Sequence, residues 1–217
     1  MGKCKEDDQF ETDPALFKVL DDIYHFQMDA AANAQNTKVS DNFLTEEDDA
    51  LVVDWRDRLT NKNPSLKFDT TKMTVFVNPP FSKKGNKDGF IQKAHMEALK
   101  GVTTVMVLPV KTDTASFHDY INRKHNVQVE FLRGRPKFFL NGAPTKTSGW
   151  SPIMIVVFYN AKPSMIEEAK LITYGRTLSP AIREWKQKLP KRPRKSRKKA
   201  EVIVTEEPKV LLGDTEQ

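Results

Sequence analysis

The chain of 217 residues contains a single cysteine, Cys4, and no apolar run long enough to cross a membrane. One cysteine cannot form a disulfide or a cluster of thiolate metal ligands within the chain. A membrane helix needs about 20 consecutive apolar residues, and the first residues, MGKCKEDDQF, lack the apolar stretch of a signal peptide. We therefore expect a protein of the reducing cytoplasm with no membrane partner.

Glycine and histidine are also scarce, with 9 and 4 residues. Gly85 and Gly89 have the wrong spacing for a dinucleotide-binding fingerprint and lie in the lysine-rich stretch SKKGNKDG. The histidines show no spacing typical of metal ligands, so we expect no metal site. They are His25, His95, His118 and His125.

Charge is unevenly distributed, although the formal net charge is only +6. Lys and Arg number 6 against 15 Asp and Glu in residues 1–60, 19 against 9 in residues 61–185, and 10 against 5 in residues 186–217. This asymmetry favours a first part that holds a cationic or neutral small ligand and a later part that binds a polyanion. For any single charge, a solvated surface is the alternative.

Helical and strand patterns alternate through the first half of the chain. Asp13 and Pro14 combine a capping side chain with a first-turn proline, and apolar residues at helical spacing follow. The stretches MTVFV at 73–77 and VTTVMVL at 102–108 predict buried strands. Between them, an apolar helical pattern ends at Gly101, a favourable residue for a helix C-terminus.

Two later segments, 127–131 and 151–159, predict a further pair of strands, with an Asn141-Gly142 turn signal between them. Together with the earlier alternation, this pattern predicts an α/β fold with a doubly wound, mostly parallel sheet and an antiparallel edge.

The composition changes after residue 160, and we predict three regions. Residues 1–160 form the main domain, 161–189 a helical extension, and 190–217 a basic tail. The tail begins PKRPRKSRKKA, which has too many charges and too few apolar residues to fold alone.

The strand at 73–77 runs directly into Asn78, Pro79, Pro80 and Phe81. Prolines cannot continue a sheet, and an ordinary strand end needs only one. Ligands of open α/β sheets bind beyond the carboxyl ends of the strands. The amide oxygen of Asn78 and the carbonyl of Pro79 can each accept one N–H of a planar amine, and Phe81 can stack on its ring. The alternative is a capped turn that only closes the strand.

NPPF is similar to the (Asn/Asp/Ser)-Pro-Pro-(Tyr/Phe) motif of amino methyltransferases that use S-adenosylmethionine. The blocks FETDP, MDAAANAQN, EEDDALVVDW, VNPPFS, VMVLPVKTDTASFHDYI and FLRGRPKF resemble, in order and spacing, those of the phage-type Dam family of DNA adenine methyltransferases. The resemblance covers residues 9–159. It implies a Rossmann-like methyltransferase catalytic domain that transfers a methyl group from S-adenosylmethionine to the N6 amine of adenine in double-stranded DNA.

The resemblance also implies roles for single residues. Residues 78–81 would hold the target adenine, flipped out of the duplex. Asp29 and the alanines after it would bind the methionine part of the cofactor, Asp54-Trp55 its adenine, and Asp41 its ribose. The full set of implied cofactor-binding residues is Phe10, Thr12, Asp29, Ala30, Ala31, Ala32, Asp41, Asp54, Trp55 and Asn78.

No separate target-recognition domain is visible, so basic loops would contact the DNA. We expect a phage- or prophage-encoded protein of a bacterial host cell, a monomer or weak dimer, with a role either in protection from restriction or in regulation. The predicted DNA-binding residues are Lys83, Lys84, Lys87, Lys111, Arg133, Arg135 and Lys137.

Other interpretations stay open. The same chemistry could act on RNA or on a glutamine side-chain amide, because both present planar amino groups. A non-catalytic DNA-binding protein with a methyltransferase-like fold is a further alternative. For Asp54-Trp55 the alternative is structural, a capping carboxylate beside a packed indole.

Overall fold

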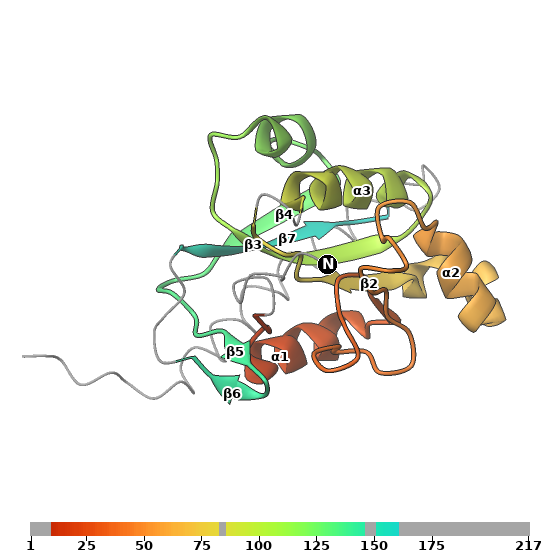
Figure 1. The fold of residues 1–217 in the computed structure, drawn as a ribbon. Helices are drawn as coiled ribbons and strands as arrows, with labels where there is room; N and C mark the ends of the chain where they lie inside the picture. Colours follow the sequence, from red (N-terminus) through yellow and green to blue (C-terminus); the bar gives the residue numbers. More distant parts are fainter. Residues whose placement is uncertain (1–9, 83–85, 146–150, 161–217) are drawn as a thin grey trace, which may run out of the picture.

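A five-stranded sheet in the order β1-β2-β3-β7-β4 forms the centre of the molecule (Figure 1). The computed structural model describes residues 10–82, 86–145 and 151–160. β1, β2 and β3 are parallel, whereas β7 is antiparallel to both of its neighbours, β3 and the edge strand β4. The strands of the sheet are β1 (Met28–Asp29), β2 (Thr74–Val77), β3 (Thr103–Pro109), β4 (Val127–Phe131) and β7 (Ile153–Phe158).

The central strands are apolar along their whole length because both of their faces are covered. Every residue of β2, β3 and β7 is buried, as expected for strands that pack against other elements on both sides. The prediction of a mostly parallel sheet with an antiparallel pair at one edge is confirmed. The pair is β4 and β7, and β7 is the member that runs in the opposite direction.

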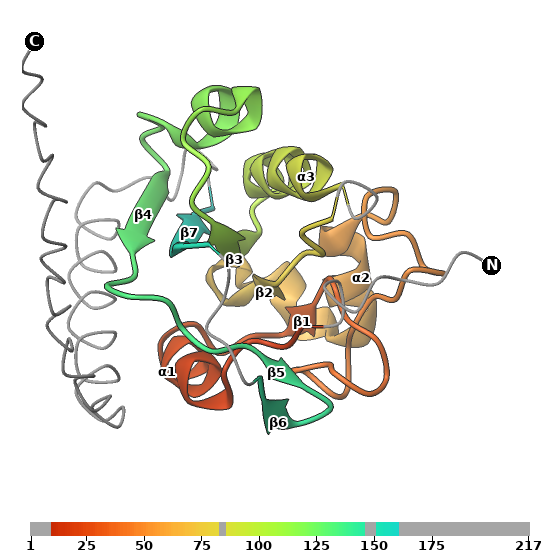
Figure 2. The ribbon, with the colours of Figure 1, turned by 60° about the vertical axis from the view of Figure 1, so that its left-hand side comes forward.

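Helices cover both faces of the sheet, as the end-on view in Figure 2 shows. α1 packs on one face with Phe76 and Val105, while α2, α3 and η4 contribute to the apolar cluster on the other face, with Val75 and Met106. The bounds are α1 (Pro14–Tyr24), α2 (Trp55–Lys62), α3 (Lys87–Leu99) and η4 (Phe117–Ile121, a π-helical turn), with 3₁₀ turns η2 (Pro64–Lys67) and η3 (Thr70–Lys72).

The predicted helix signals act where expected. The Asp13 carboxylate accepts a hydrogen bond from the Ala15 N–H at 2.8 Å, with Pro14 in the first turn of α1. At the end of α3, Gly101 has φ 101°, a conformation that L side chains rarely adopt. These local signals mark the start of α1 and the end of α3. The helical extension and the basic tail lie outside the described residues, so the division into three regions stays a prediction.

Candidate active site

Two predicted site residues meet at the carboxyl ends of neighbouring parallel strands. Asp29 is the last residue of β1 and pairs in register with Phe76 of β2, and Asn78 follows β2 directly. This edge is where open α/β sheets bind ligands. A small hollow with about 30 Å³ of free space, partly open to solvent, lies there. Its lining residues are Phe10, Glu11, Thr12, Asp29, Ala31, Asn36, Lys38, Phe76, Asn78 and Pro80.

The amide of Asn78 has a fixed orientation. Its Nδ2 donates a hydrogen bond to the backbone carbonyl of Phe10 at 2.9 Å. A carbonyl can only accept, so the other amide atom, Oδ1, is the one left for a ligand. Oδ1 is buried and has no hydrogen-bond partner among the described residues. An unsatisfied buried acceptor costs roughly 1–3 kcal/mol, and a bound N–H donor would remove that cost.

Residues 10–12, which orient Asn78, belong to a small β-structure beside the hollow. Glu11 exchanges two backbone hydrogen bonds with Phe139, at 2.8 and 2.9 Å. Phe139 begins a hairpin of β5 (Phe139–Leu140) and β6 (Ala143–Pro144), which Figure 2 shows on the α1 side of the sheet. Its turn is the predicted Asn141-Gly142, with φ of 51° and 74°. The hairpin therefore anchors residues 10–12 over the strand ends.

Asp29 is a buried carboxylate without a cationic hydrogen-bond partner in the described part of the chain. Its oxygens accept the backbone N–H groups of Lys38, at 2.9 Å, and Ala31, at 3.3 Å. Burial raises the pKa of Asp29 to about 6, against the lowering effect of these two bonds. A cationic group placed beside it would relieve this desolvation penalty. The predicted role at the methionine end of a cofactor is chemically compatible with this environment.

Glu11 and Lys38 line the same hollow, and we did not predict either of them. The Lys38 ammonium lies 2.8 Å from Glu11 Oε2, and the Gly142 N–H donates to Glu11 Oε1 at 3.0 Å. Burial tends to raise the pKa of the Glu11 carboxyl, but the bonds from Lys38 and Gly142 outweigh it and hold the pKa below its usual value. Glu11 is thus ionised and bonded to two segments of the site.

Thr12 and the three alanines after Asp29 are the other predicted cofactor-binding residues near the hollow. Thr12 lines the hollow, and its buried Oγ1 has no partner within the described ranges. Of the three alanines after Asp29, Ala31 lines the hollow, Ala30 is fully buried in the core, and Ala32 donates its N–H to Leu44. Two unsatisfied oxygens in one hollow, from Thr12 and Asn78, fit a ligand rich in N–H and O–H donors.

The structure contradicts the predicted contact of Asp54-Trp55 with a cofactor adenine. Trp55 is 0% exposed, and its indole N–H donates to the Ala50 carbonyl at 2.8 Å, so neither ring face is open to a ligand. The Asp54 carboxylate caps α2 through the Asp57 N–H and pairs with Lys100 at 2.6 Å. The structural alternative for this pair is therefore the correct one.

Asp41 is also misplaced by the sequence prediction. Phe43 pairs in parallel with Asp29, the last residue of β1. Asp41 precedes Phe43 and so lies toward the amino end of that strand, away from the ligand edge. It lines a separate cavity of about 180 Å³ together with Gln27 and Lys62.

The residues of the motif Asn78–Phe81 differ in their surroundings: some line the hollow and others are packed in the protein interior. Pro80 lines the hollow, Pro79 is buried, and the half-buried Phe81 ring packs edge-on against Phe138 with centroids 5.9 Å apart. Phe81 is not one of the residues that line the hollow, so the predicted stacking on a base stays a prediction that requires the ring to move.

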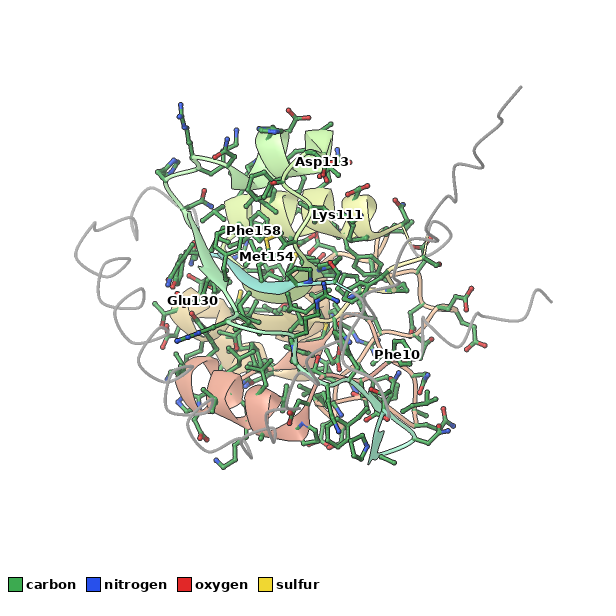
Figure 3. All side chains as sticks on the ribbon, turned by 90° about the vertical axis from the view of Figure 1, so that its left-hand side faces the viewer. Phe10, Lys111, Asp113, Glu130, Met154 and Phe158 are labelled. Atoms are coloured by element: carbon green, nitrogen blue, oxygen red, sulfur yellow. The ribbon has the colours of Figure 1, made fainter. Side chains whose placement is uncertain are left out.

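Four of the predicted DNA-binding residues follow β3 or β4 in the chain. Between β4 and the hairpin, exposed basic residues alternate with buried apolar ones. The exposed residue Lys111 follows β3, and Figure 3 shows it toward α3, with Phe10 lower, toward the hairpin. Lys87 pairs with Asp88 and is only 13% exposed. Lys83 and Lys84 lie outside the described residues. The exposed basic residues after β4 are Arg133, Arg135 and Lys137.

The described residues hold neither a cluster of metal ligands nor a helix able to cross a membrane. Within residues 10–82, 86–145 and 151–160, no group of three or more His, Cys, Asp or Glu side chains is arranged to hold a metal ion. Over the same ranges, no helix has the length and apolar character to cross a bilayer.

A mostly parallel sheet with an acidic residue at the end of β1 and Asn-Pro-Pro-Phe after β2 is the arrangement expected of an α/β enzyme that acts on an amino group. Residues 2–176 match the family model described as DNA N-6-adenine-methyltransferase (Dam). The chain belongs to this family, which confirms the predicted resemblance, and it is a DNA N6-adenine methyltransferase. The match does not favour RNA, glutamine or non-catalytic alternatives. No curated protein matched the chain.

Proposed function

We propose that the methyl donor is S-adenosylmethionine and that it binds in the hollow between Asp29 and Asn78. When bound, this cofactor supplies an electrophilic methyl group on a sulfonium centre. The hollow suits it because Glu11 and Asp29 supply two carboxylates against one ammonium, that of Lys38. The residues proposed to hold it are Phe10, Thr12, Asp29 and Ala31, whereas Asn78 borders the place of the methyl group and holds the acceptor amine.

The target amine is held by Asn78 in this proposal. Adenine N6 is a poor nucleophile because its lone pair is delocalised into the ring. Oδ1 of Asn78 and the carbonyl of Pro79 each accept one N–H, which directs the nitrogen toward the methyl group. Positioning of this kind needs no strong base. The observation that carries the proposal is the buried Oδ1, which lacks a partner in the described structure and whose orientation Phe10 fixes.

The DNA approaches from the side of the basic residues. An amino group inside a stacked duplex is inaccessible, so the adenine is extruded from the helix before transfer. Arg133, Arg135 and Lys137 are exposed beyond β4 and would neutralise phosphates near the hollow. We further propose a doubly wound Rossmann-like domain, a monomer or weak dimer, and protection of phage DNA from restriction as its biological role.

The test is a transfer reaction with isotopically labelled S-adenosylmethionine and either duplex DNA or RNA of the same sequence. Mass spectrometry of the digested product should show labelled N6-methyladenine from the DNA reaction only. Label recovered in RNA or in protein, with none in DNA, would overturn the assignment. A reaction that proceeds on DNA without added S-adenosylmethionine would overturn the choice of donor.

A further inference from the structure

Lys38 supplies the sole cationic side chain among the described residues that line the hollow. Its side chain is 14% exposed and that of its partner Glu11 is 8% exposed, so the pair is largely removed from water. The backbone N–H of Lys38 donates to Asp29 Oδ2 at 2.9 Å. The backbone of Lys38 is therefore bonded to Asp29. The Lys38 ammonium and the Asp29 carboxylate line the same hollow.

A buried ion pair contributes little net stability to the fold by itself. Removing two charges from water costs several kcal/mol per ion, and apolar side chains of similar volume often serve stability as well. Residues 10–12 are already held in place by other bonds, because Glu11 pairs with Phe139 through its backbone and its carboxylate accepts the Gly142 N–H. The ammonium of Lys38 adds little to this anchoring. We therefore infer that its role in the hollow is to bind a ligand.

The cofactor proposed for this hollow ends in an α-amino acid, which carries one ammonium and one carboxylate. Asp29 has no cation bonded to it in the described structure and can take the ammonium. The carboxylate then needs a cation, because a carboxylate beside Asp29 and Glu11 alone would be repelled. A charge-assisted bond from an ammonium is the strongest contact available for it.

Building on the proposed function, we propose that Lys38 binds the α-carboxylate of S-adenosylmethionine, and that Glu11 is the counter-ion that holds the Lys38 ammonium toward the hollow. Lys38 is then a specificity-determining residue for the amino-acid end of the cofactor. Glu11 is a positioning residue that acts through Lys38.

The experiment compares two ligands by isothermal titration calorimetry on the full chain: S-adenosylmethionine, and its decarboxylated analogue, which keeps the ammonium and lacks the carboxylate. The unmodified protein should bind S-adenosylmethionine about 10- to 100-fold more tightly than the analogue, the usual size of a charge-assisted bond. In Lys38→Gln this ratio should fall to within about threefold, because the group that reads the carboxylate is gone.

Three further variants keep the test decisive. Lys93→Gln removes a lysine from a comparably buried ion pair on α3, with Glu97, outside the hollow, and should keep the unmodified ratio. Should Lys38→Gln fold poorly, Glu11→Gln/Lys38→Gln removes both charges and should also abolish the preference. Glu11→Gln alone keeps the Lys38 ammonium but removes its counter-ion, so the ratio should fall part of the way toward that of Lys38→Gln. An unchanged ratio in Glu11→Gln would overturn the positioning role of Glu11.

A ratio in Lys38→Gln or in the double variant equal to that of the unmodified protein would overturn the assignment of Lys38. Failure of the unmodified protein to bind S-adenosylmethionine at all would instead overturn the proposed cofactor, so the two failures are distinct.

Discussion

The side chain of Asn78 and the backbone of Phe10 are joined by one hydrogen bond of 2.9 Å, and this bond determines which atom of the amide is left for a substrate. The donor is Nδ2, so the acceptor Oδ1 remains unsatisfied in the described structure. The N-terminal segment therefore orients a residue that lies 68 positions further along the chain. Because the hairpin holds that segment through Glu11 and Phe139, the orientation of the Asn78 amide depends on β5 and β6 as well as on β2.

Trp55 tests the corrected interpretation of the Asp-Trp pair. Phenylalanine in its place cannot donate to the Ala50 carbonyl, which would then be buried without that partner. We expect Trp55→Phe to lower the free energy of unfolding by roughly 1–3 kcal/mol, as measured by urea denaturation. The Kd for S-adenosylmethionine should change less than about twofold, or under ~0.5 kcal/mol. A loss of cofactor affinity with unchanged stability would restore the stacking role.

Asp29 should impose a pH dependence on cofactor binding. Its pKa is about 6 in the free protein, raised by burial, and only the ionised form attracts an ammonium group. Affinity for S-adenosylmethionine should therefore increase as pH rises from 5 to about 7, a range in which the ligand's amino group stays protonated. Calorimetric titrations at several pH values should show this step in the unmodified protein. The step should be absent in Asp29→Asn.

The same group makes a prediction for stability. The folded protein holds the Asp29 proton more tightly than the unfolded chain does, because the pKa is raised from 3.8 to about 6. The favourable contribution is complete below about pH 3.8 and is lost as pH rises through about 6. Relative to the unmodified protein, Asp29→Asn should therefore gain up to roughly 3 kcal/mol between pH 4 and 7, about 1.4 kcal/mol for each pKa unit. A stability difference independent of pH in denaturant titrations would contradict the buried, ionised carboxylate.

Arg133 and Arg135 test the proposed path of the DNA. Replacing both by glutamine should weaken duplex binding about equally for all sequences, and should reduce the slope of log K against log salt by up to about 1.8, since each phosphate contact contributes about 0.9. Lys18→Gln/Lys72→Gln removes two exposed lysines, 74% and 73% exposed, from elsewhere on the surface. This control should leave the slope nearly unchanged. Equal effects of the two pairs would mean that binding depends on net charge alone.

Local signals allowed most of the framework to be predicted from the sequence. A capping aspartate with a proline predicts the start of α1, and an Asn-Gly pair predicts the hairpin turn, because each depends on nearby residues only. The meeting of Asp29 and Asn78 was also predictable, since parallel strands bring their carboxyl ends to one edge. The doubly wound detail stays a prediction.

The errors arose where a role depends on distant packing. Asp54-Trp55 was placed by resemblance, whereas the local signal, a carboxylate before a helix, was the correct one. No local pattern indicates that Phe43 extends the sheet beside Asp29, and this pairing places Asp41 toward the amino end of β1. The Glu11 and Lys38 pair spans 27 positions with no periodic pattern, so no local signal indicated it.

The most direct test of the account is methyl transfer by Asn78→Ala, with cofactor affinity measured on the same preparation. Loss of a preorganised polar group in a catalytic site lowers kcat by about 10²–10³. We expect such a loss in the rate of N6-methyladenine formation on duplex DNA, while the Kd for S-adenosylmethionine stays within about fivefold, or ~1 kcal/mol. Undiminished turnover in Asn78→Ala would contradict the claim that Oδ1 of Asn78 holds the reacting amine.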